Sequence, residues 1–248
     1  MSPLILALTA GAVIGLALGA LGGGGSVLAV PALIYLLGFT PVAAGTASLV
    51  IVAATSATAL SGHARDGQVR WRTGALFAAA GIGPALLGGA IAGRLPAVAL
   101  TGAFAVVATV AAVRMLRSRK SSDDARPVRS ARAAAAGGGL GAVTGVLGVG
   151  GGFLAVPALV GVLGLRMREA VGTSLLVITV NSLAALVMRA GTADGLDWAV
   201  IAPFAGAAIL GAWDGKRLAS RVSGGRLQRI FAWVLLAVAL FMLADTVV

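Results

Sequence analysis

The chain has 248 residues, of which 59% are hydrophobic and only 11% are charged. Soluble domains carry about 25% charged residues, so this composition excludes an ordinary soluble domain. The chain has no cysteine, which excludes disulfides, thiol catalysis and thiolate metal sites, and its formal net charge is +11.

Long apolar stretches follow one another and predict an all-α integral membrane protein. A membrane-spanning helix needs about 20 mostly apolar residues, and most of the stretches approach that length. The first stretch is not expected to be a signal peptide, because no Lys or Arg precedes Arg65. The stretches lie at residues 3–21, 42–61, 73–93, 95–113, 133–147, 169–188, 198–213 and 230–244, with shorter ones at 26–39 and 153–165.

A run of four glycines interrupts the chain after the first stretch, in LGGGGSVLAVPAL at residues 21–33. Glycine in a helix interior costs about 1 kcal/mol relative to alanine, so the run predicts the end of one helix. The following segment, Ser26 to Leu37, would be about 18 Å long as a helix, which is too short to span a membrane. Backbone broken at membrane depth is tolerated only where protein buries it or where it lines a cavity, and we expect a cavity here.

The apolar span after the glycine run carries small polar side chains. The second half of the chain has the same order, a glycine motif followed by a span with small polar side chains. Residues 145–159, which include LGVGGGFLAVPAL at 147–159, match residues 19–33 at 11 of 15 positions with an offset of 126. Spacings of eight residues, such as Ser48 to Ser56 and Ser174 to Ser182, place each pair roughly on one helix face. The polar residues are Thr46, Ser48, Thr55, Ser56 and Thr58 in the first half, and Thr173, Ser174, Thr179, Asn181 and Ser182 in the second.

The repeat predicts two homologous halves, residues 1–116 and 133–248, joined by a hydrophilic cytoplasmic linker at 117–132. Each half is expected to hold a glycine-broken helical hairpin and three transmembrane helices, giving about eight transmembrane elements. With inverted repeats, loops 62–72, 114–132, 166–168 and 214–229 share one face and contain 17 of the 19 basic residues. Short cytoplasmic loops hold the excess of Lys and Arg, so an inverted arrangement with both termini outside is preferred over a parallel one.

The basic residues lie in short loops beside the apolar spans. Orientation of the protein in the membrane and attraction to anionic lipid therefore explain the net positive charge. Nucleic-acid binding is disfavoured, because no aromatic platform or recognition helix accompanies the basic residues. The expected partners are the lipid bilayer and a small solute, and formation of a homo-oligomer is left open.

The glycine breaks predict an anion site. A helix that begins at a break presents unpaired amides and the positive end of its dipole, which attract anions, and transporters with inverted repeats place such breaks at the midplane. A P-loop is excluded because no Gly-Lys-Ser/Thr follows either run. The residues predicted to bind are Gly22, Gly23, Gly24, Gly25, Ser26, Thr46, Ser48, Gly148, Gly150, Gly151, Gly152, Thr173, Ser174 and Asn181.

Several prolines, spaced glycines and small hydroxyls in the apolar segments also have structural interpretations. Pro31 and Pro157 each lie six residues after a glycine run and predict a helix kink. Glycines four residues apart, as in Gly11-Gly15-Gly19 and Gly141-Gly145, predict seams of helix packing. The small hydroxyls can bind an anion, but they can equally bond neighbouring helices or their own backbone.

These motifs resemble the sulfite exporter TauE/SafE family. The resemblance rests on the two glycine-Val-Pro motifs, on GTASL at 45–49 and GTSLL at 172–176, and on GGAIAGRLP at 88–96. It implies a permease of the bacterial inner membrane that transports small sulfur-containing anions such as sulfite or sulfonates. GTASL has one more residue between Thr and Ser than GTSLL, which leaves open whether Thr46 or only Ser48 matches the second half.

Two other classes of function were weighed against transport. An intramembrane enzyme needs titratable or metal-binding groups at depth, whereas every charged residue here lies near a span end or in a loop, so no enzyme, cofactor or metal is expected. His63, the only histidine, is predicted to be a solvated loop residue, and Glu169 is predicted to form a loop ion pair. A structural or accessory membrane protein, or a channel-like anion pore, remains the alternative.

Overall fold

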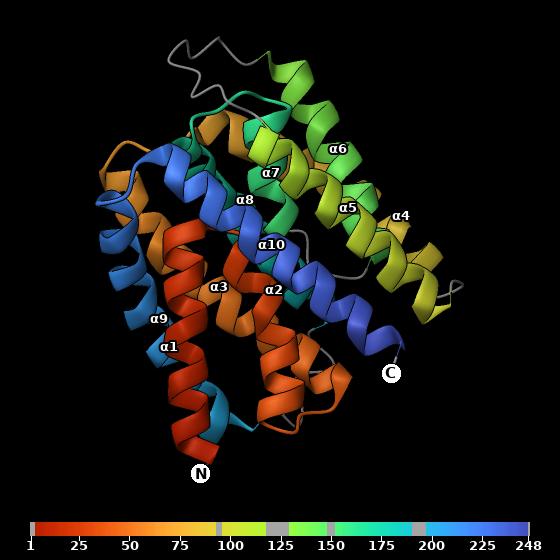
Figure 1. Ribbon diagram of the computed structural model, residues 1–248, viewed down its shortest axis with the longest axis vertical. Helices are drawn as coiled ribbons and strands as arrows, with labels where there is room; N and C mark the ends of the chain where they lie inside the picture. Colours follow the sequence, from red (N-terminus) through yellow and green to blue (C-terminus); the bar gives the residue numbers. More distant parts are fainter. Residues whose placement is uncertain (1–2, 93–95, 118–128, 148–151, 190–196, 248) are drawn as a thin grey trace.

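The computed structural model describes residues 3–92, 96–117, 129–147, 152–189 and 197–247, and these residues form helices joined by short loops (Figure 1). Five helices within this part are long and apolar enough to cross a membrane. They are α1 (Pro3–Leu21), α3 (Pro41–Arg65), α8 (Met167–Met188), α9 (Trp198–Ser220) and α10 (Gly224–Val247). The remaining elements are α2 (Gly24–Pro31), the π-helical segment η1 (Ala32–Leu36), α4 (Trp71–Ala92), α5 (Ala97–Arg117), α6 (Ser130–Leu147) and α7 (Gly152–Gly161). The prediction of an all-helical fold is confirmed for the described residues.

The predicted half-length helices follow both glycine motifs. α2 and η1 together run from Gly24 to Leu36, and α7 has only 10 residues. Pro31 is the last residue of α2, and the wider π turns of η1 follow it directly. Because proline has no N–H to donate to the preceding turn, a change of helical geometry at this position has a local cause. Pro157 lies inside α7, which continues through it.

α3 extends beyond its predicted end. The apolar stretch stops at residue 61, but the helix continues to Arg65, and the connection to α4 is reduced to residues 66–70. Polar side chains can continue a helix when its last turn packs against protein, because the helical hydrogen bonds do not depend on hydropathy. The N-terminus of α3 is capped by Thr40, whose side chain accepts a hydrogen bond from the Ala43 amide at 3.4 Å.

Two close helix pairs frame the molecule, α1 with α9 and α4 with α6 (Figure 1). In α1, a Cβ on Gly15 would overlap the backbone of Ala208, and one on Gly19 would overlap that of Ala212. In α6, Gly141 lies in the same way against the backbone of Gly81. The predicted glycine seams are therefore packing surfaces, because only glycine allows helix backbones to approach so closely.

α3 and α8 cross at the centre and run antiparallel. Near the middle, the hydroxyls of Ser56 and Thr179 share a hydrogen bond of 2.8 Å. At one end, His63 lies against Gly172, and at the other a Cβ on Gly45 would lie 2.9 Å from an Arg189 nitrogen. Exchanging the two halves maps this helix pair onto itself, and it maps the α1–α9 pair onto the α6–α4 pair. These contacts are the ones expected if a two-fold axis relates the two halves, and the inverted repeat itself stays a prediction.

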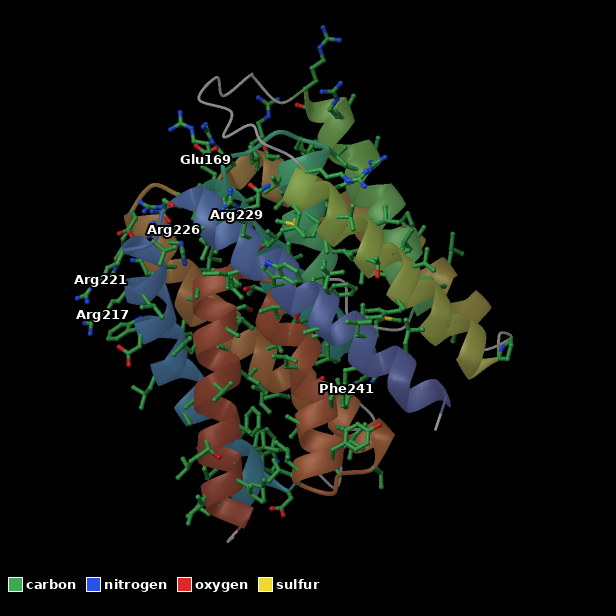
Figure 2. All side chains as sticks on the ribbon, in the orientation of Figure 1. Glu169, Arg217, Arg221, Arg226, Arg229 and Phe241 are labelled. Carbon is green, nitrogen blue, oxygen red and sulfur yellow. The ribbon has the colours of Figure 1, made fainter. Side chains whose placement is uncertain are left out.

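α10 crosses the face of the molecule and packs along α5. The Gln228 side chain donates a hydrogen bond of 2.7 Å to the Met115 carbonyl oxygen near one end of this pair. Near the other end, the Phe241 ring meets Tyr35 of η1 edge-on, with 6.4 Å between ring centroids (Figure 2). The buried core includes Phe104 and Phe153, whose rings lie 4.9 Å apart.

The charged side chains gather at the end of the molecule away from the N-terminus. Figure 2 shows Glu169, Arg226 and Arg229 in this upper part, and Arg217 and Arg221 at the left edge, closer to mid-height. Ion pairs and hydrogen bonds join the 66–70 loop, the start of α8 and the end of α9 at this end. Which side of the membrane this end faces stays a prediction from the charge count.

Candidate functional site

The first glycine motif breaks the chain between α1 and α2. Gly22 has a φ of +69°, a left-handed conformation that side chains disfavour, and its amide donates to the Leu18 carbonyl oxygen at 2.8 Å. A Cβ on Gly22 would also overlap the Ser174 hydroxyl oxygen of α8. The predicted break is confirmed, and it is held against the second half of the chain.

The second motif lies directly beside the first. Gly148, Gly150 and Gly151 fall outside the described residues, but α6 ends at Leu147 and α7 begins at Gly152. A Cβ on Gly23 would overlap the Gly152 carbonyl oxygen. The start of α2 and the start of α7 are therefore in backbone contact, as paired half-sites require.

The N-terminus of α2 has no side-chain cap from its N-cap residue. The first amides of a helix have no acceptor within it, and the residue before α2, Gly23, provides no side-chain cap. The Ser26 hydroxyl donates to the Gly23 carbonyl oxygen at 2.8 Å, so in this hydrogen bond it satisfies an acceptor and does not cap an amide of α2. Two positive helix ends at one point repel each other, and an anion between them would remove that repulsion.

The predicted hydroxyls on α3 and α8 are buried. Those of Ser48 and Ser174 donate to the carbonyl oxygens of Gly45 and Val171, each at 2.8 Å. The Thr173 hydroxyl accepts a hydrogen bond of 3.1 Å from the Arg70 amide. Thr46, 1% exposed, belongs to the same buried set. The hydroxyls of Ser48, Thr173 and Ser174 thus bond backbone groups, as expected if their role is structural. Of these three residues, Ser174 is the one that lies against the first glycine break, at Gly22.

Asn181 differs from the hydroxyls. Its side-chain oxygen is buried and has no hydrogen-bond partner among the described residues. Asn181 follows Ser174 by seven residues and Ile178 by three, so all three lie on one face of α8. Ile178 and Ser174 touch the two breaks, at Gly152 and Gly22 respectively. This face of α8 therefore carries an unsatisfied polar group on the side that meets the breaks.

His63 corrects a prediction. It is not a solvated loop residue, because its side chain is only 4% exposed in the last turn of α3. Its Nε2 lies 3.2 Å from the Gly19 carbonyl oxygen and its Nδ1 lies 2.9 Å from Oε1 of Gln68. The sequence could not show this burial, since α3 was expected to end before His63.

A small cavity lies beside His63. Its volume is about 10 Å³, which is room for about one water molecule. Asp66, Gln68, Arg168 and Lys216 are among the side chains that line it. At the breaks, Gly23 and Gly152 are in contact, and the cavity expected between the two breaks stays a prediction, because residues 148–151 fall outside the described residues.

Ion pairs close the charged end across the two halves. Glu169, predicted to form a loop ion pair, pairs with Arg70 of the first half at 2.8 Å. Lys216 of α9 lies 2.9 Å from an Asp66 oxygen and donates to the Gly62 carbonyl oxygen at 2.7 Å. Sequence reasoning missed Lys216, Gln68 and Arg70, because nothing in their local sequence indicates which distant loop they meet.

The chain is similar to a transporter family and to proteins described as probable membrane transporters. A family model described as sulfite exporter TauE/SafE matches residues 7–242. Two proteins of Xylella fastidiosa, from strains 9a5c and Temecula1, are each described as a probable membrane transporter protein. They are 34% and 33% identical over 249 aligned residues, which cover 97% of this chain and 95% of each relative. No solved structure gives a significant match.

Proposed function

The chain belongs to the sulfite exporter TauE/SafE family, and from this premise we propose that it is a secondary transporter for a small, sulfur-containing anion. It is a multi-pass membrane transporter. Sulfite, a sulfonate or a similar anion is its substrate, bound where α2 and α7 begin. The protein resides in the bacterial inner membrane.

The contact between Gly23 and Gly152 carries the proposal. It brings the glycine break of each half to one point, where the N-terminus of α2 meets that of α7. No Asp or Glu occurs in residues 1–65 or 130–168, so these segments supply no negative charge to the two helix ends. A small anion with several oxygen acceptors matches the amides that the breaks uncover.

Inverted repeats give this site access from both sides. The antiparallel packing of α3 against α8 supports an inverted relation between the halves, because helices equivalent in parallel repeats would run in the same direction. In the present arrangement the breaks are packed together and the charged end is closed by ion pairs. Binding therefore requires α2 or α7 to move away from its counterpart, as alternating access around a midplane site involves.

Counterflow in proteoliposomes tests the proposal. Vesicles preloaded with unlabelled sulfite should take up labelled sulfite faster than unloaded vesicles, and external methanesulfonate or sulfite should compete while chloride does not. A channel-like pore would show uptake that preloading does not accelerate. An accessory protein would give the same uptake as empty vesicles. Either result would overturn the proposed function.

A further inference from the structure

The two short helices carry the same motif in different surroundings. The sequence LAVPAL occurs at residues 28–33 and again at 154–159. In α7, seven of the ten residues are buried, whereas Leu28, Val30 and Pro31 in α2 are only half-buried. Since the motif is identical, the difference comes from the helices that surround each copy.

Other helices enclose α7. It packs against α5, α6 and α8 (Figure 1), and the centroid of the Phe153 ring lies 4.9 Å from that of Phe104. Phe153, Leu154 and Val156 belong to one buried cluster with residues of α5, α8 and α10. A displacement of α7 would open voids in this cluster, and close-packed interiors resist such voids. The surroundings of α7 therefore hold it in place.

The contribution of α2 to the core is smaller. Among the described side chains of α2, Ala29 belongs to a buried hydrophobic cluster, and Leu28 and Val30 pack on that cluster as half-buried residues. Segments with few buried apolar contacts are the ones that move at low cost in free energy. With one partly exposed face, α2 can shift toward the lipid while it gives up few buried contacts.

The helical hydrogen-bond pattern changes at both ends of α2. Before it, α1 ends at Leu21 and Gly22 has a φ of +69°. After it, Pro31 is followed by the π-helical segment η1, and π turns are rare and occur mostly at functional sites. The other helix, α7, continues from Pro157 to Gly161, so proline permits this change without requiring it. The eight residues of α2 thus form a rigid unit between two points where the backbone can turn.

An aromatic contact supports the outer side of η1. Tyr35 meets Phe241 of α10 edge-on, and the two residues are 60% and 55% exposed. The residue at the equivalent position of α7 is Gly161, where a Cβ would have nothing within 4 Å. Because both rings already lie at the surface, this contact can separate without opening the core.

We propose that α2 is the moving gate of this transporter, turning between Gly22 and η1 while α7 stays fixed. The inference rests on the proposed function, which requires one of the two short helices to move. When α2 moves, the contact between Gly23 and Gly152 is broken, and the amides at the starts of both helices become accessible to an anion. The first half of the chain then carries the gate, and the second half carries the fixed side of the site.

Two matched cysteine variants show which helix moves, since the native chain has no cysteine. Ala29 in α2 and Ala155 in α7 occupy equivalent positions of the repeat, and both are 0% exposed. N-ethylmaleimide reacts with the thiolate, so it labels a cysteine only when that position reaches water. Methanesulfonate is the transported anion in this experiment, because sulfite itself reacts with maleimides. During methanesulfonate exchange, Ala29→Cys should become labelled and Ala155→Cys should stay protected.

Full labelling of both variants in denaturant gives the reference for this experiment. Labelling of Ala155→Cys alone, equal labelling of the two variants, or equal protection of both would overturn the inference.

Substitution of the two prolines tests the pivot without thiol chemistry. Alanine at residue 31 restores the N–H that proline lacks and lets the α-helix continue into η1. Pro31→Ala should therefore lower the maximal rate of sulfite counterflow per folded molecule, while the sulfite concentration for half-maximal counterflow stays unchanged. Pro157→Ala is the matched control, because α7 is already a continuous α-helix at this position, and its rate should match the wild type.

These outcomes separate the gate from the transport function. Wild-type counterflow of sulfite together with equal rates for Pro31→Ala and Pro157→Ala would overturn the inference and leave the proposed function standing. Absence of counterflow by the wild-type protein, with both sulfite and methanesulfonate, would overturn the proposed function instead.

Discussion

The backbone of Gly23 lies directly against that of Gly152, so that a Cβ on Gly23 would overlap the Gly152 carbonyl oxygen and would lie 2.7 Å from the Phe153 Cα. Neither neighbour is the movable end of a flexible side chain. The two residues come from different halves of the chain, and each stands at the start of a short helix. A larger side chain at position 23 would therefore force α2 and α7 apart.

Gly23→Ala should therefore impair transport and stability together. Forcing one extra methyl group into a packed contact typically costs about 1–3 kcal/mol, and here it also separates the two helix ends. Thermal unfolding of the purified protein and sulfite counterflow per folded molecule would measure the two effects. The matched control is Gly139→Ala on α6, where nothing lies within 4 Å of a Cβ. Equal transport by the two variants would show that the glycine contact has no role in function.

Gly22→Ala and Ser174→Gly should be coupled. An alanine at residue 22 meets the Ser174 hydroxyl oxygen and also adopts a left-handed backbone. Adding Ser174→Gly removes the overlap but leaves the backbone cost of about 1–2 kcal/mol. The double variant should accordingly melt at a higher temperature than Gly22→Ala and at a lower one than Ser174→Gly. Strictly additive losses would mean that residues 22 and 174 are not in contact.

The seam glycines should behave differently from the break glycines. A Cβ on Gly141 would overlap the backbone of Gly81, whereas Gly139, two residues earlier on α6, faces open space. Gly141→Val should reduce the folded fraction recovered in detergent, because α4 and α6 cannot separate without losing the rest of their contact. Gly139→Val, which adds the same side chain to the same helix, should elute as the wild type does in size-exclusion chromatography. A normal elution profile for Gly141→Val would contradict the seam.

The helix break and the glycine packing seams could be predicted from the sequence, because each depends on a local residue pattern or on the internal repeat. The glycine run at residues 22–25 ends a helix by backbone preference alone, and the repeat then pairs this motif with the one before Gly152. The four-residue glycine spacing predicted the seams, since close approach of helices in a membrane needs small residues. Each of these inferences depends on residues near one another in the chain.

The environment of His63 depended on contacts between distant residues. Its burial follows from four residues of helix beyond the apolar stretch and from Gly19, 44 positions earlier in the chain. Glu169 likewise was expected to form an ion pair, but its partner Arg70 lies 99 positions away. Hydropathy and spacing show that His63 and Glu169 are polar and lie near a span end. Their hydrogen-bond and ion-pair partners become visible only once the two halves are packed together.

The orientation of the charged end can be tested with introduced cysteines, since the native chain has none. Ser130→Cys lies at the start of α6 near the linker, and Trp198→Cys lies at the start of α9; both side chains are exposed. If the positive charges face the cytoplasm, a membrane-impermeant maleimide should label residue 198 in intact cells and residue 130 only after lysis. The reverse pattern would invert the proposed topology.

The Asn181 amide offers the sharpest side-chain test of the anion site. Its oxygen is buried without a partner among the described residues, and a half turn of the amide would present two N–H donors in its place. Asn181→Ala removes these donors, and a hydrogen bond to a charged group contributes about 1.5–3 kcal/mol. We therefore expect the sulfite concentration for half-maximal counterflow to rise by about tenfold to a hundredfold.

Asn181→Asp separates anion binding from general polarity at this position. Aspartate has nearly the same size but, when ionised, accepts hydrogen bonds only and repels an anion. It should abolish counterflow more completely than Asn181→Ala does. Thr144→Val is the control, because among the described residues its buried hydroxyl bonds only the carbonyl oxygens of Leu140 and Gly141 within its own helix, and its sulfite affinity should match the wild type. An unchanged affinity in Asn181→Ala, or faster transport by Asn181→Asp than by Asn181→Ala, would remove Asn181 from the binding site.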